Sequence, residues 1–184
     1  PKETVLIAGS TAAVPLIQEL YARVLQRGAV PIVRVSIPDL EHTFYSLAND
    51  FQIKHVSKIA YCEARTIDAA IYVQSETNTK SLSGIHPKKI AAVRQARRRL
   101  NDIIHDRVRW TLTLYPTAAY AQDAGMSLPE FERFVGKAMF ADKKDPIGEW
   151  RRLSSRQAAI AKRLNAAQAV RILGKDTDLT MSVK

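Results

Sequence analysis

The sequence holds little of several residue types on which whole protein classes depend. It contains a single cysteine, Cys62, among 184 residues, so no disulfide can form within the chain and a cytoplasmic location is expected. Its longest apolar runs, such as residues 69–73, fall far short of the roughly 20 residues that a membrane-spanning helix needs. No basic segment followed by an apolar stretch opens the chain, so no signal peptide is predicted. The sequence therefore favours a cytoplasmic protein without a membrane partner.

Histidine is also scarce, and the chain has only four: His42, His55, His86 and His105. No two of them are spaced for a shared helical face, and no H-E-x-x-H motif occurs. His105 and Asp106 are adjacent, so their side chains diverge by about 100° on a helix, and Glu130 and Glu132 do not share a helical face. A dinuclear hydrolytic centre needs several carboxylate and imidazole ligands around two ions. We therefore predict surface or loop-capping histidines, and no metal-binding residue in this chain.

Signals for a catalytic nucleophile or a cofactor loop are weak as well. Cys62 is followed by Glu63, a carboxylate rather than the cation that would favour a reactive thiolate. There is no G-x-S-x-G motif. The turn at Gly9, Ser10 and Thr11 has one glycine where a dinucleotide fingerprint needs three, and it has no P-loop lysine. We predict a tight turn with a hydroxyl cap, and neither catalytic nor cofactor-binding residues.

The composition is that of a folded protein with a basic surface. Hydrophobic residues make up 46% and charged residues 25% of the chain, enough for one core with a small appendage. Twenty-eight Lys and Arg against eighteen Asp and Glu give a net charge of +10. Such an excess suits nucleic acid, an acidic surface or an acidic partner domain. The distribution of the charges must decide between these partners.

Alternation of short apolar runs with helical periods indicates an α/β domain. Four β-rich runs are predicted as strands, at residues 4–8, 30–35, 69–74 and 110–114. A helix between the first two has apolar residues at spacings of three and four and ends at Gly28. A short helix is expected at 41–49, and the segment after it is ambiguous. We predict a three-layer, Rossmann-like domain with a mainly parallel sheet.

After residue 116 the pattern becomes helical. Residues 127–130, Ser-Leu-Pro-Glu, match a capping box, and the face behind it is predicted to consist of Phe131, Phe134, Val135 and Ala138. Asp145 and Pro146 open a further helix, and we expect its inward residues to be Trp150, Leu153, Ile160, Ala161 and Leu164. Strands at 168–173 and 179–183, joined by a turn at 174–176, then form a hairpin that the sequence leaves uncapped. This pattern predicts a truncated β-hairpin at the end of a fragment.

A long helix beginning at Pro87 carries the densest positive charge. Its apolar face is predicted to be Ile90, Val93, Ala96, Leu100, Ile103 and Ile104. The basic residues on and after this helix are Lys88, Lys89, Arg94, Arg97, Arg98, Arg99, Arg107 and Arg109. They spread around the rest of the helix instead of forming a stripe, and no aromatic residues alternate with them for base stacking. A solvated or domain-facing surface is favoured, and a freestanding nucleic-acid-binding module remains the alternative.

Several long motifs resemble one protein family. Residues 109–142, RWTLTLYPTAAYAQDAGMSLPEFERFVGKAMFAD, are similar to a segment of the aminopeptidase T family of metallopeptidases. So are residues 145–154, DPIGEWRRLS, and residues 174–183, GKDTDLTMSV. Earlier pieces, VLIAGSTAAVPL and SETNTKSLSGIHP, match the same family in order. The resemblance therefore covers nearly the whole chain.

The resemblance implies an exopeptidase of two domains that removes N-terminal residues from peptides, uses two divalent ions (zinc or cobalt) and forms a homodimer. Its metal ligands would come from a C-terminal catalytic domain, so no catalytic or metal-binding residue is carried over onto residues 1–184. On this basis the chain is expected to be the N-terminal α/β domain, a fragment that is inactive alone. It would form a wall of the substrate chamber and part of the dimer contact. The turn at Tyr115, Pro116 and Thr117 is the expected contact with the catalytic domain.

Overall fold

The computed structural model describes residues 2–183 and separates into two compact units, Pro1–Glu132 and Arg133–Lys184. The first unit contains a four-stranded sheet with helices, and the second contains a long helix and a two-stranded sheet. The mixed α/β architecture predicted from the sequence is confirmed. No helix within residues 2–183 combines the length and the apolar character needed to cross a membrane.

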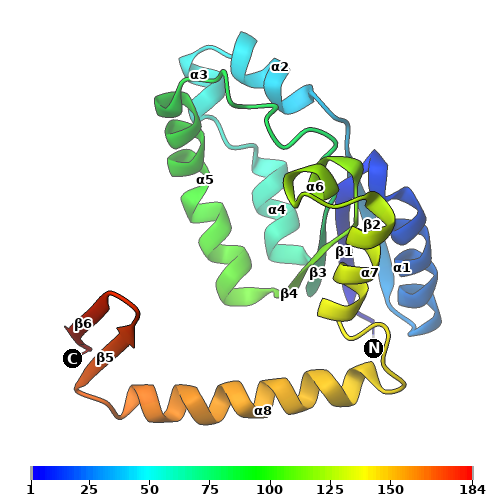
Figure 1. Ribbon diagram of the computed structural model, residues 1–184. Helices are drawn as coiled ribbons and strands as arrows, with labels where there is room; N and C mark the ends of the chain where they lie inside the picture. Colours follow the sequence, from blue (N-terminus) through cyan, green and yellow to red (C-terminus); the bar gives the residue numbers. More distant parts are fainter. Residues whose placement is uncertain (1, 184) are drawn as a thin grey trace. The chain divides into compact units, whose positions relative to one another are not determined.

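All strands of the first unit run parallel, in the order β2-β1-β3-β4 (Figure 1). Their bounds are β1 Thr4–Ser10, β2 Val30–Ser36, β3 Ala69–Gln74 and β4 Arg109–Leu114. The central strand β1 is an apolar run because it is covered on both faces, and Val5, Leu6 and Ile7 are all buried. Pro31 lies in the edge strand β2, where its missing N–H removes no bond to an outer neighbour.

Helices cover both faces of this sheet (Figure 1). Helix α1 (Val14–Gln26) packs on one face, where Ile7 and Val73 cluster with Ile17. Helices α4 (Lys58–Thr66) and α5 (Pro87–Arg107) lie on the other, where Leu6 and Ala70 cluster with Ile67 and Val108. The side chains of successive strand residues point to opposite faces, so neighbouring apolar residues pack into different clusters. This is the predicted three-layer arrangement.

Local signals in the sequence account for the ends of these elements. The Ser10 hydroxyl accepts a hydrogen bond from the Ala12 N–H and caps the short 3₁₀-helix η1 (Thr11–Ala13). Gly28 follows α1 with φ of 75°, a conformation that costs glycine little. Both predictions are confirmed. Helix α5 begins at Pro87 as predicted, and its cap is the ring of His86, whose Nδ1 accepts from the Lys88 N–H at 3.2 Å.

The short helix predicted at 41–49 is confirmed as the first of three consecutive short helices, and the stretch after it that the sequence left ambiguous forms the other two. These are α2 Leu40–Leu47, α3 Asp50–Lys54 and α4. Asn49 and Gln52 form a capping box that starts α3. Tyr45 and Ile53 are buried against Val93 of α5, in a cluster separate from the two on the sheet.

Two helices follow the sheet, α6 (Ala118–Asp123) and α7 (Leu128–Ala138). One of the two bonds of the predicted capping box is seen, because the Glu130 carboxylate accepts from the Ser127 N–H at 3.0 Å. Phe131 and Val135 are buried as predicted, whereas Phe134 is 54% exposed. The prediction was wrong for Phe134 and also for Ala138, which is exposed, because a helical period identifies an apolar face and does not reveal whether another surface covers it.

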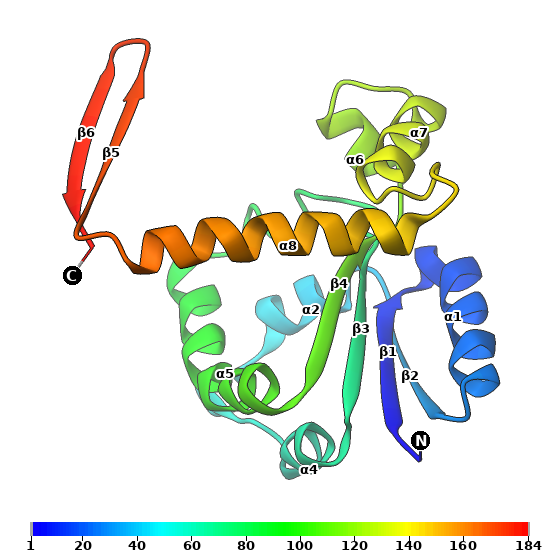
Figure 2. The same ribbon diagram turned by 90° about the horizontal axis from the view of Figure 1, so that it is seen from below.

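The second unit contains α8 (Pro146–Asn165) and an antiparallel hairpin of β5 (Ala169–Gly174) and β6 (Thr177–Ser182), visible in Figure 2. The hairpin was predicted, but with later bounds for its second strand. Gly174 pairs with Thr177 instead of lying in the turn, because Asp176 adopts a left-handed φ of 59° and closes a two-residue loop.

The predicted inward face of α8 is not buried. Trp150, Ile160 and Leu164 are 49%, 55% and 49% exposed, and the helix has no buried residue within the described part of the chain. Trp150 is held locally, since its Nε1 donates to the Met139 carbonyl at 3.1 Å and its ring meets Phe140 edge to face. The period identified the apolar face correctly, but a helical pattern does not reveal whether another surface covers it.

Candidate functional site

The carboxyl ends of the parallel strands form the candidate site. The chain passes from β1 to β2 on one side and then crosses to β3 on the other side of β1. This reversal between β1 and β3 is a topological switch point, where open α/β sheets place their ligand crevice. Ser10 ends β1 and Ser75 directly follows β3, so both residues lie at this point.

The two serines are bonded to each other rather than free. Their hydroxyl oxygens are 2.8 Å apart, and the Ser10 hydroxyl also lies 2.8 Å from the Ser75 carbonyl, to which it donates. The Ser10 N–H donates to the Ser75 hydroxyl at 3.2 Å, and Ser75 is only 2% exposed. The pair therefore fastens two strand ends together. Ser75 was not singled out from the sequence, although a small hydroxyl residue directly after a buried strand was the available signal.

Gly9 lets these strands approach closely. A Cβ at Gly9 would lie 3.1 Å from the Cβ of Val73 and 3.2 Å from Cδ1 of Ile17, tighter than ordinary contacts between side chains. The residue is thus required by packing between β1, β3 and α1. Together with the Ser10 cap, this supports the predicted tight turn with a hydroxyl cap.

The crevice itself is small, polar and acidic. It encloses about 240 Å³ and its carboxylates are Asp39, Glu41 and Glu76, with His42 beside them. No lysine or arginine of the described residues lines it, although the chain as a whole carries a net charge of +10. The crevice therefore favours neutral polar or cationic groups over phosphates, in contrast to the glycine-rich loops of nucleotide-binding relatives of this architecture.

The four histidines are scattered through the first unit. His42 lines the crevice, His86 caps α5, and His55 and His105 line a separate groove between α4 and α5. Throughout residues 2–183, no three His, Cys, Asp or Glu side chains come together as a set that could hold a metal ion. The residues that the structure describes do not fit a dinuclear centre. Whether any residue of this chain ligates a metal in the whole protein remains a prediction.

The turn at Tyr115, Pro116 and Thr117 is tied into the first unit. The Tyr115 N–H donates to the Gln74 carbonyl at 2.8 Å, and the Thr117 hydroxyl donates to the Glu76 carbonyl at 2.6 Å. Tyr115 also packs against the cluster beneath α1. Replacing Tyr115 would therefore disturb the domain itself, and the predicted contact of this turn with a catalytic domain remains a prediction.

Tyr120 extends this network toward the crevice. Its hydroxyl oxygen accepts from the Glu76 N–H at 3.2 Å, and burial raises the pKa of Tyr120 above its ordinary value. The side chain therefore stays protonated at neutral pH. The hydrogen bond holds the backbone of Glu76, and so connects the segment after β3 to helix α6.

The basic residues of α5 and β4 divide into two groups. Three of them serve the fold: Lys89 donates to the Tyr45 carbonyl at 2.9 Å, Arg107 donates to the carbonyls of Ala64 and Arg65, and Arg109 pairs with Glu3 at 2.7 Å. The others are exposed, namely Lys88, Arg94, Arg97, Arg98 and Arg99. Part of the positive charge predicted for this region therefore stabilises the fold.

Comparisons with known proteins agree with this fold. The family model described as "Thermophilic metalloprotease (M29)" matches residues 1–184. The structure of wild-type AmpT from Thermus thermophilus is similar to this chain, with a TM-score of 0.74 at 20% sequence identity. That match covers 99% of this chain and 49% of AmpT, so the chain spans about half the length of the solved structure. No curated protein matches significantly.

These findings bear on the resemblance noted in the sequence. The solved structure supports the fold, because at this identity only the architecture carries over. The family model spans every motif on which the resemblance rested, from the first strand to the hairpin. The chain belongs to the thermophilic metalloprotease family, the aminopeptidase T family of metallopeptidases.

Proposed function

We propose that this chain is the non-catalytic N-terminal α/β domain of a metal-dependent aminopeptidase that removes N-terminal amino acids from peptides. The observation that supports this most directly is the family match over residues 1–184, combined with a structural match to about half of AmpT. A peptidase of this family would then have a second part, of similar size, outside residues 1–184.

The proposal assigns the metal ligands to that second part. Two divalent ions, zinc or cobalt, would polarise the peptide carbonyl and activate water when bound there. No group of three potential ligands converges within residues 2–183, which is consistent with this assignment. The domain described here would instead wall the substrate chamber and take part in a cytoplasmic homodimer. Residues 1–184 would be inactive on their own.

The test compares this chain with the full polypeptide encoded by the same gene. Both are assayed on a peptide with a free amino terminus and on its N-acetylated form, after dialysis against a chelator and after adding back zinc or cobalt. We expect metal-dependent release of the first residue only by the longer protein and only from the free peptide. Metal-dependent release by residues 1–184 alone would overturn the assignment. A native gene product of about this size in its own cells would do the same.

A second candidate is a nucleic-acid-binding module, favoured by the five exposed basic residues on α5: Lys88, Arg94, Arg97, Arg98 and Arg99. Binding through phosphates weakens steeply as salt rises. A titration of labelled single-stranded RNA and DNA at several salt concentrations separates the two candidates. Tight binding with a steep salt dependence would favour the module. Weak, salt-insensitive binding would exclude it.

A further inference from the structure

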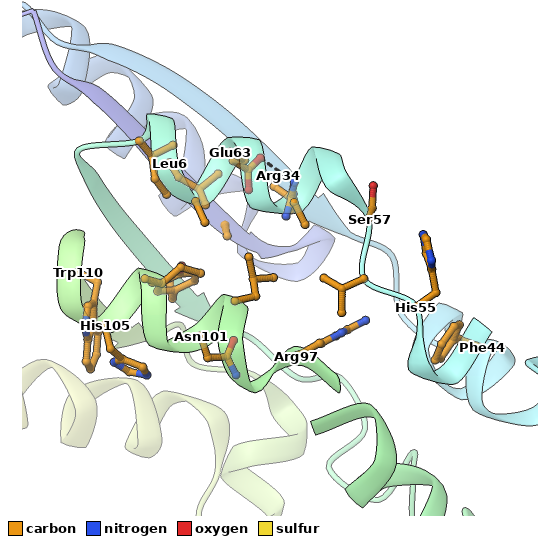
Figure 3. Close-up of a pocket in the computed structure, with 18 of the residues that line it drawn as sticks. Leu6, Arg34, Phe44, His55, Ser57, Glu63, Arg97, Asn101, His105 and Trp110 are labelled. Atoms are coloured by element: carbon orange, nitrogen blue, oxygen red, sulfur yellow. Dashed lines mark hydrogen bonds and ion pairs between the residues drawn. The ribbon is translucent and has the colours of Figure 1, made fainter. Parts of the chain in front are cut away.

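A groove of about 920 Å³ lies in the first unit, between α4, α5 and one face of the sheet (Figure 3). Its floor is formed by sheet residues Leu6, Ala8, Tyr72 and Leu112. Its walls include Ala60 and Ala64 of α4 and Leu100 and Ile104 of α5. The groove lies on the face of the sheet, away from the crevice at the strand ends, and it has a volume typical of sites for small molecules.

The groove exists because α5 is anchored at two separate places. Near its C-terminal end, Ile104 packs against the sheet cluster that contains Leu6. Nearer its N-terminal end, Val93 packs in the other cluster, with Tyr45 and Ile53. Between these anchors α4 presents alanines, which are too small to fill the space beneath the helix. The opening is therefore built into the packing of the domain.

The charges along the groove leave one positive group uncompensated. Among the described residues that line the groove, Glu63 is the one acidic residue, and it forms an ion pair with Arg34 at 2.6 Å. Within residues 2–183, Arg97 is in no hydrogen bond or ion pair. Asn101 follows it one helical turn later on the same side of α5, and both line the groove. An exposed guanidinium with an amide beside it suits a carboxylate at the mouth of an apolar groove.

The backbone around the groove favours an alkyl chain over an extended peptide. The walls are helices, whose N–H and C=O groups bond internally. The central strands β1 and β3 are paired on both sides, and the edge strand β4, which supplies Leu112, is paired with β3. An extended peptide lying on this floor would bury amide groups without partners, at a cost of about 1–3 kcal/mol each, whereas an alkyl chain has none to satisfy.

We propose that this groove binds an amphipathic monocarboxylate with an unbranched alkyl chain. The tail would lie between α4 and α5 over Leu6 and Tyr72, and the carboxylate would bind Arg97 and Asn101 at the mouth. This proposal does not rest on the proposed peptidase role, because it is argued only from the packing and charges of described residues around the groove.

Trp110 lines the groove and reports its occupancy, and the chain's other tryptophan, Trp150, can be removed as Trp150→Phe. In that background, fluorescence is titrated with decanoate and with 1-decanol at neutral pH. We expect a saturable change with decanoate and at least ten-fold weaker binding of 1-decanol. Equal binding of the two, or no saturable change with either, would overturn the proposal.

Variants locate the carboxylate and the tail. Arg97→Gln should weaken decanoate about ten-fold and leave 1-decanol unchanged, whereas Arg98→Gln, its exposed neighbour outside the lining, should alter neither. Ala60→Leu should block both ligands by filling the groove, and circular dichroism checks that each variant is folded. Loss of affinity equally in Arg97→Gln and Arg98→Gln would indicate general electrostatic attraction and overturn the site. Preferential binding of an apolar acetylated peptide amide would do so too.

Discussion

The two units of this chain use the same amphipathic patterns and bury them to very different extents. In the first, three clusters enclose residues such as Ile7 and Ile67, which are almost completely buried. In the second, α8 buries nothing among its described residues. The hairpin gathers its apolar side chains on one face, as cross-strand pairs of Val170 with Met181 and Ile172 with Leu179. Periodicity therefore specifies a face, and only tertiary packing specifies its burial.

The two units also differ in net charge. Residues 133–184 contain 12 Lys and Arg against 5 Asp and Glu, a net charge of +7, whereas residues 1–132 contain 16 against 13, a net charge of +3. Most of the excess that the whole-chain composition suggested for a partner thus lies in the shorter unit. An isolated two-stranded hairpin is marginally stable in water, so we expect the second unit to contribute little to the stability of the first.

The largest predicted effect concerns core truncation in the first unit. Ile7 is 0% exposed, so Ile7→Ala should lower the free energy of unfolding by about 2–5 kcal/mol, from lost burial and the cavity left behind. The matched variant is Ile172→Ala in the hairpin, where the side chain is 48% exposed; it should cost less than about 1 kcal/mol. Urea unfolding followed by circular dichroism measures both. Equal losses would mean that the hairpin face is covered, which would remove the contrast between the units.

Glycine substitutions sharpen the comparison. Gly9→Ala should destabilise the first unit by about 1–3 kcal/mol, because the new methyl group meets Val73 and Ile17 in a packed core. Gly136→Ala in α7 meets nothing within 4 Å, and it should stabilise its helix by up to about 1 kcal/mol. Thermal unfolding of the two variants should therefore shift in opposite directions. A shift of Gly9→Ala in the same direction as Gly136→Ala would show that β1 and β3 can separate at little cost.

The serine bridge at the strand ends gives a smaller effect. Ser75→Ala removes a buried hydroxyl that accepts from the Ser10 N–H, so a loss of about 1–2 kcal/mol is expected. Ser10→Ala should cost a similar amount, and the double variant should cost less than the sum of the two, because the same bonds are counted twice. Chemical unfolding of all three variants completes the cycle. Additive losses would mean that the two hydroxyls act independently.

These outcomes also indicate what the sequence could reveal. The run of Val5, Leu6 and Ile7 predicted a buried strand correctly, because a strand covered on both faces must be apolar throughout. The end of α1 before Gly28 and the start of α5 at Pro87 were predictable from the backbone preferences of glycine and proline alone. In contrast, the strand order that creates the crevice depends on which side of β1 the chain crosses, and no local pattern records this.

The groove and the Ser10–Ser75 pair were missed for a related reason. Ser75 and Ser10 are 65 residues apart in the chain, and neither residue type in isolation indicates a partner. The groove depends on two anchors of α5 and on small residues of α4 opposite Arg97. The error at α8 was the opposite one. The sequence predicted a buried apolar face there, and the structure leaves that face exposed.

The smallest effect, in the second unit, is electrostatic. Arg171 and Asp178 form a bidentate ion pair at 2.7 and 2.6 Å on the polar face of the hairpin, and this hydrogen bonding holds the pKa of Asp178 below its usual value near 4. A carboxyl whose pKa is lowered by folding stabilises the folded state above its unfolded pKa, and this contribution is lost as the pH falls through the lowered folded pKa. Because both side chains are more than half exposed, the contribution should be small and screened by salt.

NMR titration of the Asp178 carboxyl in Arg171→Gln should give a pKa raised back toward the usual value, with Lys175→Gln as the unchanged control. An unaltered pKa in Arg171→Gln would show that the hairpin does not hold this ion pair in solution, and the hairpin would then rest on its backbone pairing and apolar cross-strand contacts alone.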